Sequence, residues 1–354
     1  MKKQIVVLPG DGVGPEVTAV AVEVIAAIGA KYDHALNIEY ADIGGIAIDN
    51  HNDPLPADTL QRCQAADAIL LGAVGGPKWS NPGATVRPEQ GLLKIRAALG
   101  LFANLRPVKP YASLAHYSPL RADRVANVDV MIVRELTGGI YFGDRVESNE
   151  LATDTCSYSA DEVRRIVRVA GGLARTRRQH LVSVDKANVL ATSRLWRNVT
   201  SEVMRTEFPD VELEHLLVDA AAMHLLQRPA DFDVMVTENL FGDILTDEAS
   251  VLSGSIGLLP SASINASGVG LYEPIHGSAP DIAGQGIANP YGTVASVAMM
   301  LRHSFGMTDE AATIETAIDQ CLEAGHLTAD LVRDDTALST QQVGSALCAA
   351  IDAL

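Results

Sequence analysis

The sequence is short of cysteine, of basic residues and of long apolar runs, and each shortage excludes something. The 354 residues include four cysteines, which lie far apart and form no CxxC pair: Cys63, Cys156, Cys321 and Cys348. Such spacing is typical of reduced, mostly buried thiols in a reducing compartment. We therefore expect a cytoplasmic protein.

Acidic residues outnumber basic ones by 44 to 27, which gives a formal net charge of −17. Binding to nucleic acid needs a basic surface, so we expect no nucleic-acid partner. No apolar stretch reaches the roughly 18 residues of a membrane span, and the apolar run after "MKKQ" is too short for a signal peptide. We therefore expect no membrane partner either. A small anionic substrate remains possible where arginines cluster.

The sequence also lacks both common nucleotide-binding glycine motifs. The phosphate-loop pattern GxxxxGK[ST] is missing, and Gly10, Gly12 and Gly14 form GxGxG, not the GxGxxG of a Rossmann dinucleotide site. These glycines follow the apolar run "QIVVL", and Pro15 opens the helical stretch after them. On these residues alone, a tight turn between a strand and a helix is the simplest interpretation.

What the sequence does contain is an alternation of strands and helices. Its length favours about two domains at roughly 100–200 residues each, and 47% of its residues are hydrophobic, enough for a sizeable core. Apolar runs that end in polar residues predict strands in "ADAILLGAVGG", "VDVMIVREL", "LVSVDKANVL" and "FDVMVTENL". Helical stretches separate most of them, and in one Ser159 and Glu162 fit a capping box. This is the pattern of an α/β fold, with functional residues expected at strand ends.

Two aspartates lie four residues apart in "NLFGDILTDEASVLSG", namely Asp243 and Asp247. On a helix this spacing stacks both carboxylates on one face, where like charges repel by roughly 0.2–0.5 kcal/mol. A divalent cation would remove the repulsion, and Asp219 after "LEHLLV" could supply a third hard oxygen ligand. Such a set favours Mg²⁺ or Mn²⁺. The alternative for Asp219 is a helix N-cap.

Three arginines end or punctuate apolar segments: Arg96, Arg106 and Arg134. Each alone is typical of a surface ion pair, but together they could clamp a dicarboxylate, because guanidinium groups match carboxylates bidentately. Near the first of them, Glu89, Leu92 and Leu93 share its helical face. A leucine pair beside an arginine suits a substrate with a carboxylate and a branched alkyl group. The alternative is a core stripe with an arginine that extends to solvent.

Two further residues could move protons. Lys186 ends the apolar run "LVSVDK", and Tyr141 lies among the glycines of "GGIYFG". Singly they are typical of a solvated strand end and of packing. As a pair, a lysine with a depressed pKa and a tyrosine could act as base and acid.

A loop rich in small residues, "YEPIHGSAPDIAGQGIANP", carries Glu273, His276, Asp281 and Asn289. It could be purely structural, but glycines that let a backbone approach a ligand favour a cofactor loop. An aspartate at an adenosine ribose accepts from the 2′-hydroxyl and repels a 2′-phosphate. Asp281 would therefore select NAD over NADP.

Taken in order, these segments resemble the isocitrate/isopropylmalate family of β-decarboxylating dehydrogenases. The resemblance is carried by "LPGDGVGPEV", "GLLKIRAALGLFANLRP", "VRELTGGIYFG", "VDKANVL", "NLFGDILTDEASVLSGSIGLLPSAS" and "EPIHGSAPDIAGQGIANP". It extends over nearly the whole chain to about residue 305. The later segment "LVRDDTALSTQQVGSALCAAI" departs from the family's glycine- and threonine-rich pattern, and no residue assigned by resemblance lies in it.

The resemblance implies an isocitrate/isopropylmalate dehydrogenase-like fold, distinct from the Rossmann fold, with two α/β domains around a central cleft. A discontinuous NAD-binding domain would comprise residues 1–101 and 255–354. Residues 102–254 would bind substrate and form a homodimer with shared active sites. The irregular segment around residues 137–159 would be an arm or hairpin that reaches the partner subunit.

The resemblance also implies a role for each candidate residue. Lys186 would act as the base on the C2 hydroxyl, and Tyr141 as the acid that protonates C3 after decarboxylation. The substrate site would comprise Arg96, Arg106, Arg134, Asp219, Glu89, Leu92 and Leu93. The ligands of Mg²⁺ or Mn²⁺ would be Asp219, Asp243 and Asp247. Lys186 and Asp219 would come from the second subunit. The NAD site would comprise Val13, Glu273, His276, Gly277, Ser278, Ala279, Pro280, Asp281, Ile282 and Asn289.

The implied reaction is the oxidative decarboxylation of (2R,3S)-3-isopropylmalate, a 2-hydroxy dicarboxylate, to 4-methyl-2-oxopentanoate in leucine biosynthesis, with reduction of NAD. Leu92 and Leu93 favour this substrate, because isocitrate enzymes carry a polar, serine-containing motif there. An NAD-dependent tartrate or D-malate dehydrogenase is the alternative. From other classes, a metal-dependent lyase or aldolase would not need the loop "HGSAPDIAG", and a dimeric binding protein would not need Lys186 and Tyr141.

Overall fold

The computed structural model describes residues 1–81, 83–332 and 336–354. Residues 333–335 of the divergent C-terminal segment therefore lie outside the described residues. The chain divides into two compact units: unit 1 is Met1–Leu101 with Ser255–Leu354, and unit 2 is Phe102–Gly254. Over the described ranges, no helix is both long and apolar enough to cross a membrane.

Unit 1 is built on a mixed sheet. Its strands lie in the order β2 (Ala35–Tyr40), β1 (Lys2–Gly10), β3 (Ala68–Ala73), β12 (Gly270–Pro274) and β11 (Pro260–Ile264). The first four run parallel, whereas β11 pairs with β12 in the antiparallel sense. Every residue of β3 is buried. Such a continuous apolar run is what a parallel strand covered on both faces requires.

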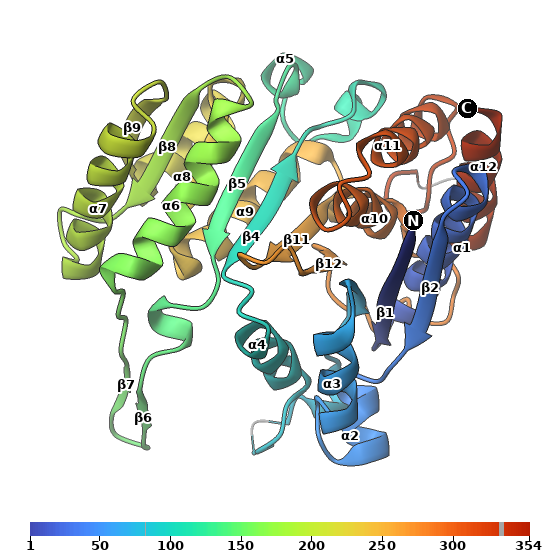
Figure 1. The fold of residues 1–354 in the computed structure, drawn as a ribbon, viewed down its shortest axis with the longest axis horizontal. Coiled ribbons are helices and arrows are strands. Elements are labelled where there is room, and N and C mark those ends of the chain that lie inside the picture. Colours follow the sequence, from blue (N-terminus) through green and yellow to red (C-terminus); the bar gives the residue numbers. More distant parts are fainter. Residues whose placement is uncertain (82, 333–335) are drawn as a thin grey trace. The chain divides into compact units, whose positions relative to one another are not determined.

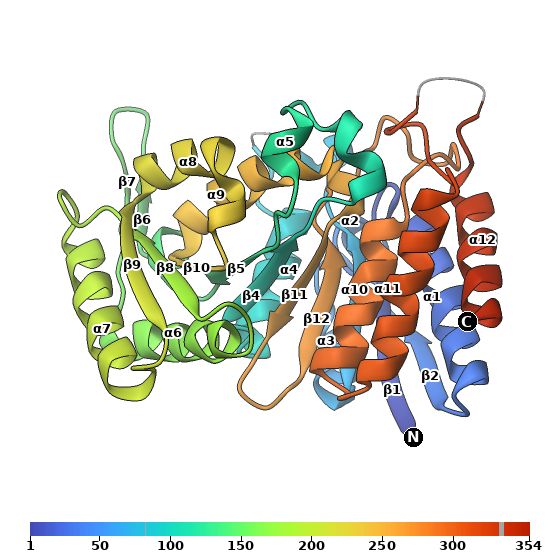
Figure 2. The ribbon, with the colours of Figure 1, turned by 90° about the horizontal axis from the view of Figure 1, so that it is seen from above.

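Helices cover both faces of this sheet (Figure 2). On one face lie α1 (Gly14–Lys31), α10 (Tyr291–His303), α11 (Thr308–Glu323) and α12 (Thr340–Ala353), and on the other α2 (Gly45–His51), α3 (Ala57–Ala65) and α4 (Pro88–Ala98). Val6 and Leu8 of β1 alternate toward the second set, where they pack with Cys63 and Ile95. The two ends of the chain meet where α1 packs against α12 (Figure 1). Two short 3-10 helices, η1 (Pro77–Trp79) and η6 (Ile256–Leu258), complete the unit.

The main strands of unit 2 lie side by side in the order β4 (Ala103–Val108), β5 (Val130–Glu135), β10 (Val234–Thr237), β8 (His180–Asp185) and β9 (Glu212–Leu217). Only β4 runs antiparallel to its neighbour within this set. One face carries α6 (Ala160–Arg175) and α7 (Ala191–Glu207), and the other carries α8 (Val218–Gln227) and α9 (Asn239–Ser250) (Figures 1 and 2). The remaining short helices are η2 (Ala112–Tyr117), α5 (Ala122–Val125), η3 (Gly139–Tyr141), η4 (Pro229–Asp231) and η5 (Val251–Ser253).

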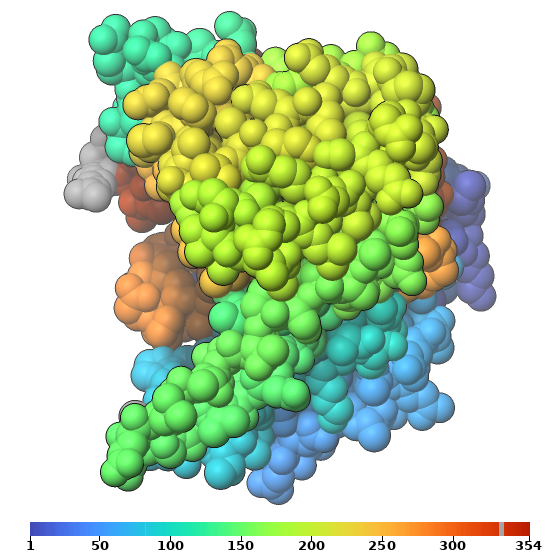
Figure 3. All heavy atoms as spheres, turned by 90° about the vertical axis from the view of Figure 1, so that its left-hand side faces the viewer, coloured from blue at the N-terminus to red at the C-terminus, as the bar shows by residue number. Residues whose placement is uncertain are grey.

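A β-hairpin extends from unit 2 and is called the arm here. Its strands β6 (Arg145–Glu147) and β7 (Ala152–Asp154) pair antiparallel, and every residue in both is exposed. Figure 3 shows the arm as a narrow green ridge that leaves the body of unit 2. Val146 and Leu151 are 59% and 63% exposed. That a partner subunit covers them stays a prediction.

Most local sequence patterns are reproduced, and the α/β class is confirmed. The capping box is present, since Ser159 and Glu162 each accept a hydrogen bond from the other's backbone N–H. The N-cap alternative for Asp219 is wrong, because Leu217 is the N-cap of α8 and Asp219 lies inside its first turn. The strand predicted over "LVSVDKANVL" stops at Asp185, where the chain turns ahead of α7.

Candidate active site

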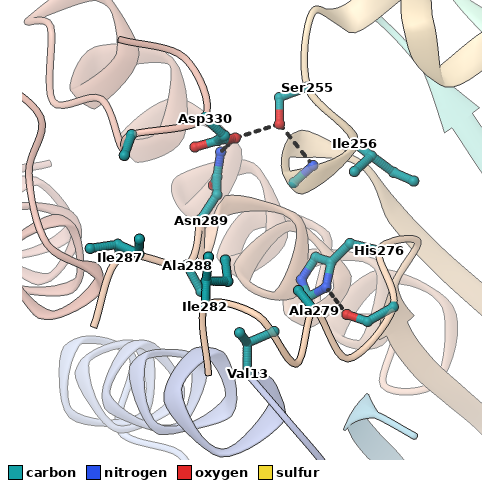
Figure 4. Close-up of a pocket in the computed structure, with 13 residues that line it drawn as sticks. Val13, Ser255, Ile256, His276, Ala279, Ile282, Ile287, Ala288, Asn289 and Asp330 are labelled. Atoms are coloured by element: carbon teal, nitrogen blue, oxygen red, sulfur yellow. Dashed lines mark hydrogen bonds between the residues drawn. The ribbon is translucent and has the colours of Figure 1, made fainter. Parts of the chain in front are cut away.

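A pocket of about 450 Å³ lies within unit 1 (Figure 4). Its walls are mainly apolar with a few polar groups, the usual make-up of a small-molecule site. It is lined by Val13, Ser255, Ile256, Gly257, His276, Gly277, Ala279, Ile282, Ile287, Ala288, Asn289, Ala329 and Asp330.

Backbone contacts hold the glycine turn after β1 against the loop around His276. The N–H of Val13 donates to the carbonyl of Ser278 at 2.9 Å. The preceding residue, Gly12, has φ +59°, and a Cβ on it would lie 1.9 Å from the carbonyl oxygen of Ser278. The glycine is therefore needed both for its left-handed conformation and for this close approach. The tight turn expected from the sequence serves here to seat a loop.

An acidic residue on α1 fixes the far end of the same loop. Glu16 accepts hydrogen bonds from the N–H groups of Gly284 and Gly286, at 2.5 and 2.9 Å. The loop is thus anchored to the start of α1 at both ends. A rigid loop of this kind can present backbone groups to a ligand without an ordering cost on binding.

His276 provides an unsatisfied acceptor in the pocket. Its Nδ1 lies 2.8 Å from the carbonyl of Gly277, which can only accept, so Nδ1 carries the proton. Its buried Nε2 has no partner. Burial lowers the pKa of His276 below its ordinary value, which keeps the ring neutral at pH 7. A ligand hydroxyl or amino group would satisfy Nε2, so this pocket fits a nucleoside-containing cofactor such as NAD.

A second polar cluster lies across the pocket. The carboxylate of Asp330 accepts from Asn289 Nδ2 at 3.0 Å and from the hydroxyl of Ser255 (Figure 4). Sequence reasoning missed Asp330 and its neighbour Ala329, since both lie beyond about residue 305, where the segments that carry the resemblance end. It also missed other lining residues inside quoted segments, namely Ser255, Ile256, Gly257, Ile287 and Ala288.

Six of the ten residues predicted for the cofactor line this pocket: Val13, His276, Gly277, Ala279, Ile282 and Asn289. The other four do not. Ser278 contributes its backbone carbonyl to the loop junction, while Pro280 and Asp281 are exposed beside the pocket. Glu273 instead pairs with an arginine.

That arginine is Arg96 on α4, whose Nη2 lies 2.7 Å from Glu273 Oε1. Arg96 is 9% exposed, and its buried Nε has no partner. An unsatisfied guanidinium N–H fits an anionic ligand, because a buried donor without an acceptor is costly. On the same helix, Leu92 and Leu93 are half-buried and Glu89 is exposed. Leu92 packs against the core of unit 1.

In unit 2 the two other predicted arginines face α9. Arg134, 4% exposed, donates from Nη1 to Asp243 Oδ1 at 2.6 Å, and Nη1 of Arg106 lies 3.7 Å from Asp247 Oδ1. Each aspartate thus has an arginine beside it. The arginines offset the repulsion between Asp243 and Asp247 within the chain. The repulsion is therefore not an argument for a bound metal, and the expectation drawn from it is corrected. What remains in favour of a metal is the donor set itself.

Tyr141 completes this cluster. Its hydroxyl donates to Asp243 Oδ2 at 2.7 Å, and the Arg134 guanidinium lies 5.9 Å from its ring centroid. Burial, together with the neighbouring Asp243 carboxylate, raises the pKa of Tyr141 to about 12. The phenol is therefore protonated at neutral pH and can serve as an acid.

Lys186 and Asp219 form a separate pair in unit 2. Lys186 follows β8, Asp219 lies in the first turn of α8, and Nζ is 2.7 Å from Oδ1. This hydrogen bond with Lys186 lowers the pKa of Asp219, although its side chain is 64% exposed. The lysine ammonium and the Asp219 carboxylate therefore form an ion pair on the surface of unit 2.

No group of three metal-binding side chains is found in the part of the chain that the structure describes. Asp243 and Asp247 lie one turn apart on α9, with side chains 38% and 66% exposed. Two exposed carboxylates one turn apart are a hard-oxygen donor set that fits Mg²⁺ or Mn²⁺. The set is incomplete within one chain, and the role of Asp219 stays a prediction.

Comparison with known proteins agrees with this picture. The family model described as "Isocitrate/isopropylmalate dehydrogenase" matches residues 4–347, so the match includes most of the divergent C-terminal segment. A 3-isopropylmalate dehydrogenase of Rhodopirellula baltica is 56% identical over 99% of both chains, and one of Bacillus subtilis is 53% identical over 99% of this chain and 98% of the relative. The crystal structure of an isocitrate dehydrogenase from Methylococcus capsulatus superposes with a TM-score of 0.88 at 34% identity, over 99% of both chains. The chain therefore belongs to the isocitrate/isopropylmalate dehydrogenase family.

Proposed function

We propose that this protein catalyses the NAD-dependent oxidative decarboxylation of (2R,3S)-3-isopropylmalate to 4-methyl-2-oxopentanoate in leucine biosynthesis. One observation carries the proposal. The chain is 56% identical to a 3-isopropylmalate dehydrogenase over its full length, but only 34% identical to an isocitrate dehydrogenase of the same fold. The half-buried Leu92 and Leu93 support it, because an isopropyl group needs an apolar contact that isocitrate does not.

Arginines would bind the two substrate carboxylates. The buried Nε of Arg96 lacks a partner, which suits an incoming carboxylate. Arg106 is held by Asn104 at 2.7 Å and by Thr246 at 2.6 Å, and Arg134 is held by Asp243. Such fixed guanidinium groups orient a substrate at little entropic cost.

Lys186 and Tyr141 would move the protons. Lys186 would accept the proton of the C2 hydroxyl as hydride leaves C2, and Tyr141 would donate its proton to C3 after the C3–carboxylate bond breaks. The position of the Tyr141 hydroxyl supports the second role, since it lies 2.7 Å from Asp243, which also contacts the substrate arginine Arg134. After one turnover Lys186 would hold one extra proton and Tyr141 would lack one, and exchange with solvent would return both to their starting states.

The cofactors would be held by the pocket of unit 1 and by the acids of α9. His276 and Asn289 would face NAD, and Asp243 with Asp247 would ligate Mg²⁺ or Mn²⁺ together with the partner's Asp219. When bound, NAD would accept the hydride and the metal would neutralise negative charge that develops on the C2 oxygen. The support is the unsatisfied Nε2 of His276 and the exposed carboxylate pair.

The active form would be a homodimer. Helices α8 and α9 pack against each other and expose Met223, Leu226 and Ile244, at 55%, 38% and 57%. Apolar side chains gathered on adjacent helices suit an isologous contact with a second copy. If active sites are shared, an inactive Lys186→Ala protein mixed with an inactive Tyr141→Phe protein should regain part of the activity. Continued inactivity after subunit exchange would count against sharing.

We also propose a cytoplasmic location. The support is the state of the cysteines: all four are free thiols, and Cys63 and Cys321 are buried. Burial raises the pKa of the Cys63 thiol to about 12, so it is inert at neutral pH.

The test is a substrate panel assayed with NAD and Mn²⁺ by absorbance of NADH. The panel contains 3-isopropylmalate, D-malate, tartrate, isocitrate and homoisocitrate. We expect the highest kcat/KM for 3-isopropylmalate and slow turnover of D-malate, since an apolar alkyl contact is worth about 1–3 kcal/mol. A preference for D-malate or tartrate would establish the alternative, and a preference for isocitrate would refute the assignment.

A further inference from the structure

A buried asparagine at the start of α9 contacts the substrate arginine of unit 2. Asn239 is 1% exposed. Its side-chain Oδ1 accepts hydrogen bonds from Nε and Nη2 of Arg134, at 3.1 and 2.9 Å. Its backbone carbonyl accepts a further bond from Nε at 2.9 Å. One residue therefore holds two of the three guanidinium nitrogens, and Asp243 holds the third at 2.6 Å.

The orientation of the Asn239 amide is fixed from its other end. Nδ2 donates to the carbonyls of Leu136 and Gly138, at 3.2 and 3.1 Å. Carbonyl oxygens only accept, so the NH₂ group must face them, and Oδ1 must face Arg134. A rotated amide would place an acceptor against two carbonyls and a donor against a cation. The side chain has one acceptable orientation, and every polar atom in it is used.

The backbone of Asn239 is fixed as well. Its N–H donates to the hydroxyl of Tyr158 at 2.9 Å, and the Glu238 side chain caps α9 by accepting from the N–H of Phe241 at 3.0 Å. Tyr158 also packs tightly against Gly138, where an added Cβ would lie 2.7 Å from the ring. Hydrogen bonds that do not involve Arg134 therefore already fix the position of Asn239.

We propose that Asn239 is a positioning residue that fixes the Arg134 guanidinium for the substrate carboxylate. The inference rests on the proposed function, in which Arg134 binds that carboxylate. Without the side chain of Asn239, Nε and Nη2 of Arg134 would lose the two hydrogen bonds to Oδ1 that set the orientation of the guanidinium, whereas Nη1 would keep its bond to Asp243. A buried arginine in a fixed orientation binds a carboxylate without losing side-chain freedom at that moment.

The test is a double-mutant cycle with Asn239→Ala and Arg134→Ala, assayed with 3-isopropylmalate, NAD and Mn²⁺. We expect Asn239→Ala to raise the KM for 3-isopropylmalate by about tenfold or more, and the KM for NAD by less than about twofold. In the Arg134→Ala background, the same change should lower kcat/KM by less than about threefold, because its target is gone. Thr200→Val is the matched control. It removes a buried hydroxyl without a partner from α7 of the same unit and should leave both KM values unchanged.

If Asn239→Ala does not fold, Asn239→Leu is used, because it keeps the volume and loses both side-chain hydrogen bonds to Arg134. Independent effects of the two mutations, or equal increases in both KM values, would show a merely structural role and overturn the proposal. Absence of turnover by the wild-type protein would instead refute the proposed function, and the positioning role would fail with it.

Discussion

If Asp247 is a metal ligand, replacing it with asparagine should change stability only when metal is present. The substitution keeps the size of the side chain and removes its charge. Without metal, two small effects oppose each other. An ion pair with Arg106 at 3.7 Å is lost from a side chain that is 66% exposed, which is worth about 0–1 kcal/mol. Repulsion from Asp243 is relieved at the same time, worth about 0.2–0.5 kcal/mol.

The expected net effect in chelator is therefore within about 0.5 kcal/mol of zero, in either direction. Bound Mn²⁺ should increase the difference in stability between the wild-type protein and Asp247→Asn. Mn²⁺ at about 100 times its Kd stabilises a protein that binds it only when folded by about 2.7 kcal/mol. Asp247→Asn should lose most of this gain, because it removes one of two carboxylates on the helix. A difference that appears only with metal is the signature of a ligand.

Thermal melts of both proteins in chelator and in Mn²⁺, paired with activity, measure this difference. Glu248→Gln is the matched control, since it removes the next carboxylate on α9 and lies outside the predicted ligand set. It should keep the full stabilisation by Mn²⁺. The metal assignment is wrong if Asp247→Asn melts lower by the same margin in both conditions and keeps metal-dependent activity.

Three further predictions concern other parts of the chain. The kcat/KM for NADP should be lower than the kcat/KM for NAD by about tenfold or more, because Asp281 would face the 2′-phosphate. Equal values would show that Asp281 does not lie at the adenosine ribose. On α6, Gly172→Ala should stabilise by about 0.5–1 kcal/mol in urea melts, since its Cβ meets nothing within 4 Å, whereas Gly171→Ala should destabilise because its Cβ would lie 2.9 Å from the Phe208 ring. Burial lowers the pKa of His303, so the unfolded state alone takes up a proton below about pH 6.5, and the unfolding free energy should fall there. His303→Gln should show a smaller fall between about pH 7 and pH 5, and an identical pH profile would refute this assignment.

Local structure could be predicted well where a single segment determines it. Asp243 and Asp247 do lie on one helix, and Ser159 does close a capping box with Glu162, because helical spacing and capping depend on residues a few positions apart. Helix and strand ends were less predictable. Apolar residues lie at both ends of "LVSVDKANVL", but its strand ends at Asp185, where pairing with β9 also ends.

Partners distant in the sequence could not be predicted from patterns. Nothing in "VMIVREL" indicates that Arg134 is held by Asn239, which lies 105 positions away. Glu273 and Arg96 are 177 positions apart in the sequence. Glu273 was expected at the cofactor, but in this structure it binds Arg96. Such pairings depend on which strands become neighbours in the sheet, and no single segment of the sequence determines that order.

Two of the polar anchors of the candidate site share one feature, which is that a side chain binds backbone groups of a neighbouring segment. Glu16 holds the N–H groups of Gly284 and Gly286, and Asn239 holds the carbonyls of Leu136 and Gly138. Glycines occur at these points for two reasons: Gly284 and Gly286 have φ values of +78° and +67°, and a Cβ on Gly138 would lie 2.7 Å from the Tyr158 ring. A substitution in one such anchor therefore displaces several ligand-facing groups at once, which is why residues remote from the chemistry can control the binding of a cofactor or a substrate. Since each of these two anchors lies wholly within one unit, a substitution of Glu16 should act mainly on the binding of NAD, and a substitution of Asn239 mainly on the binding of the hydroxy acid.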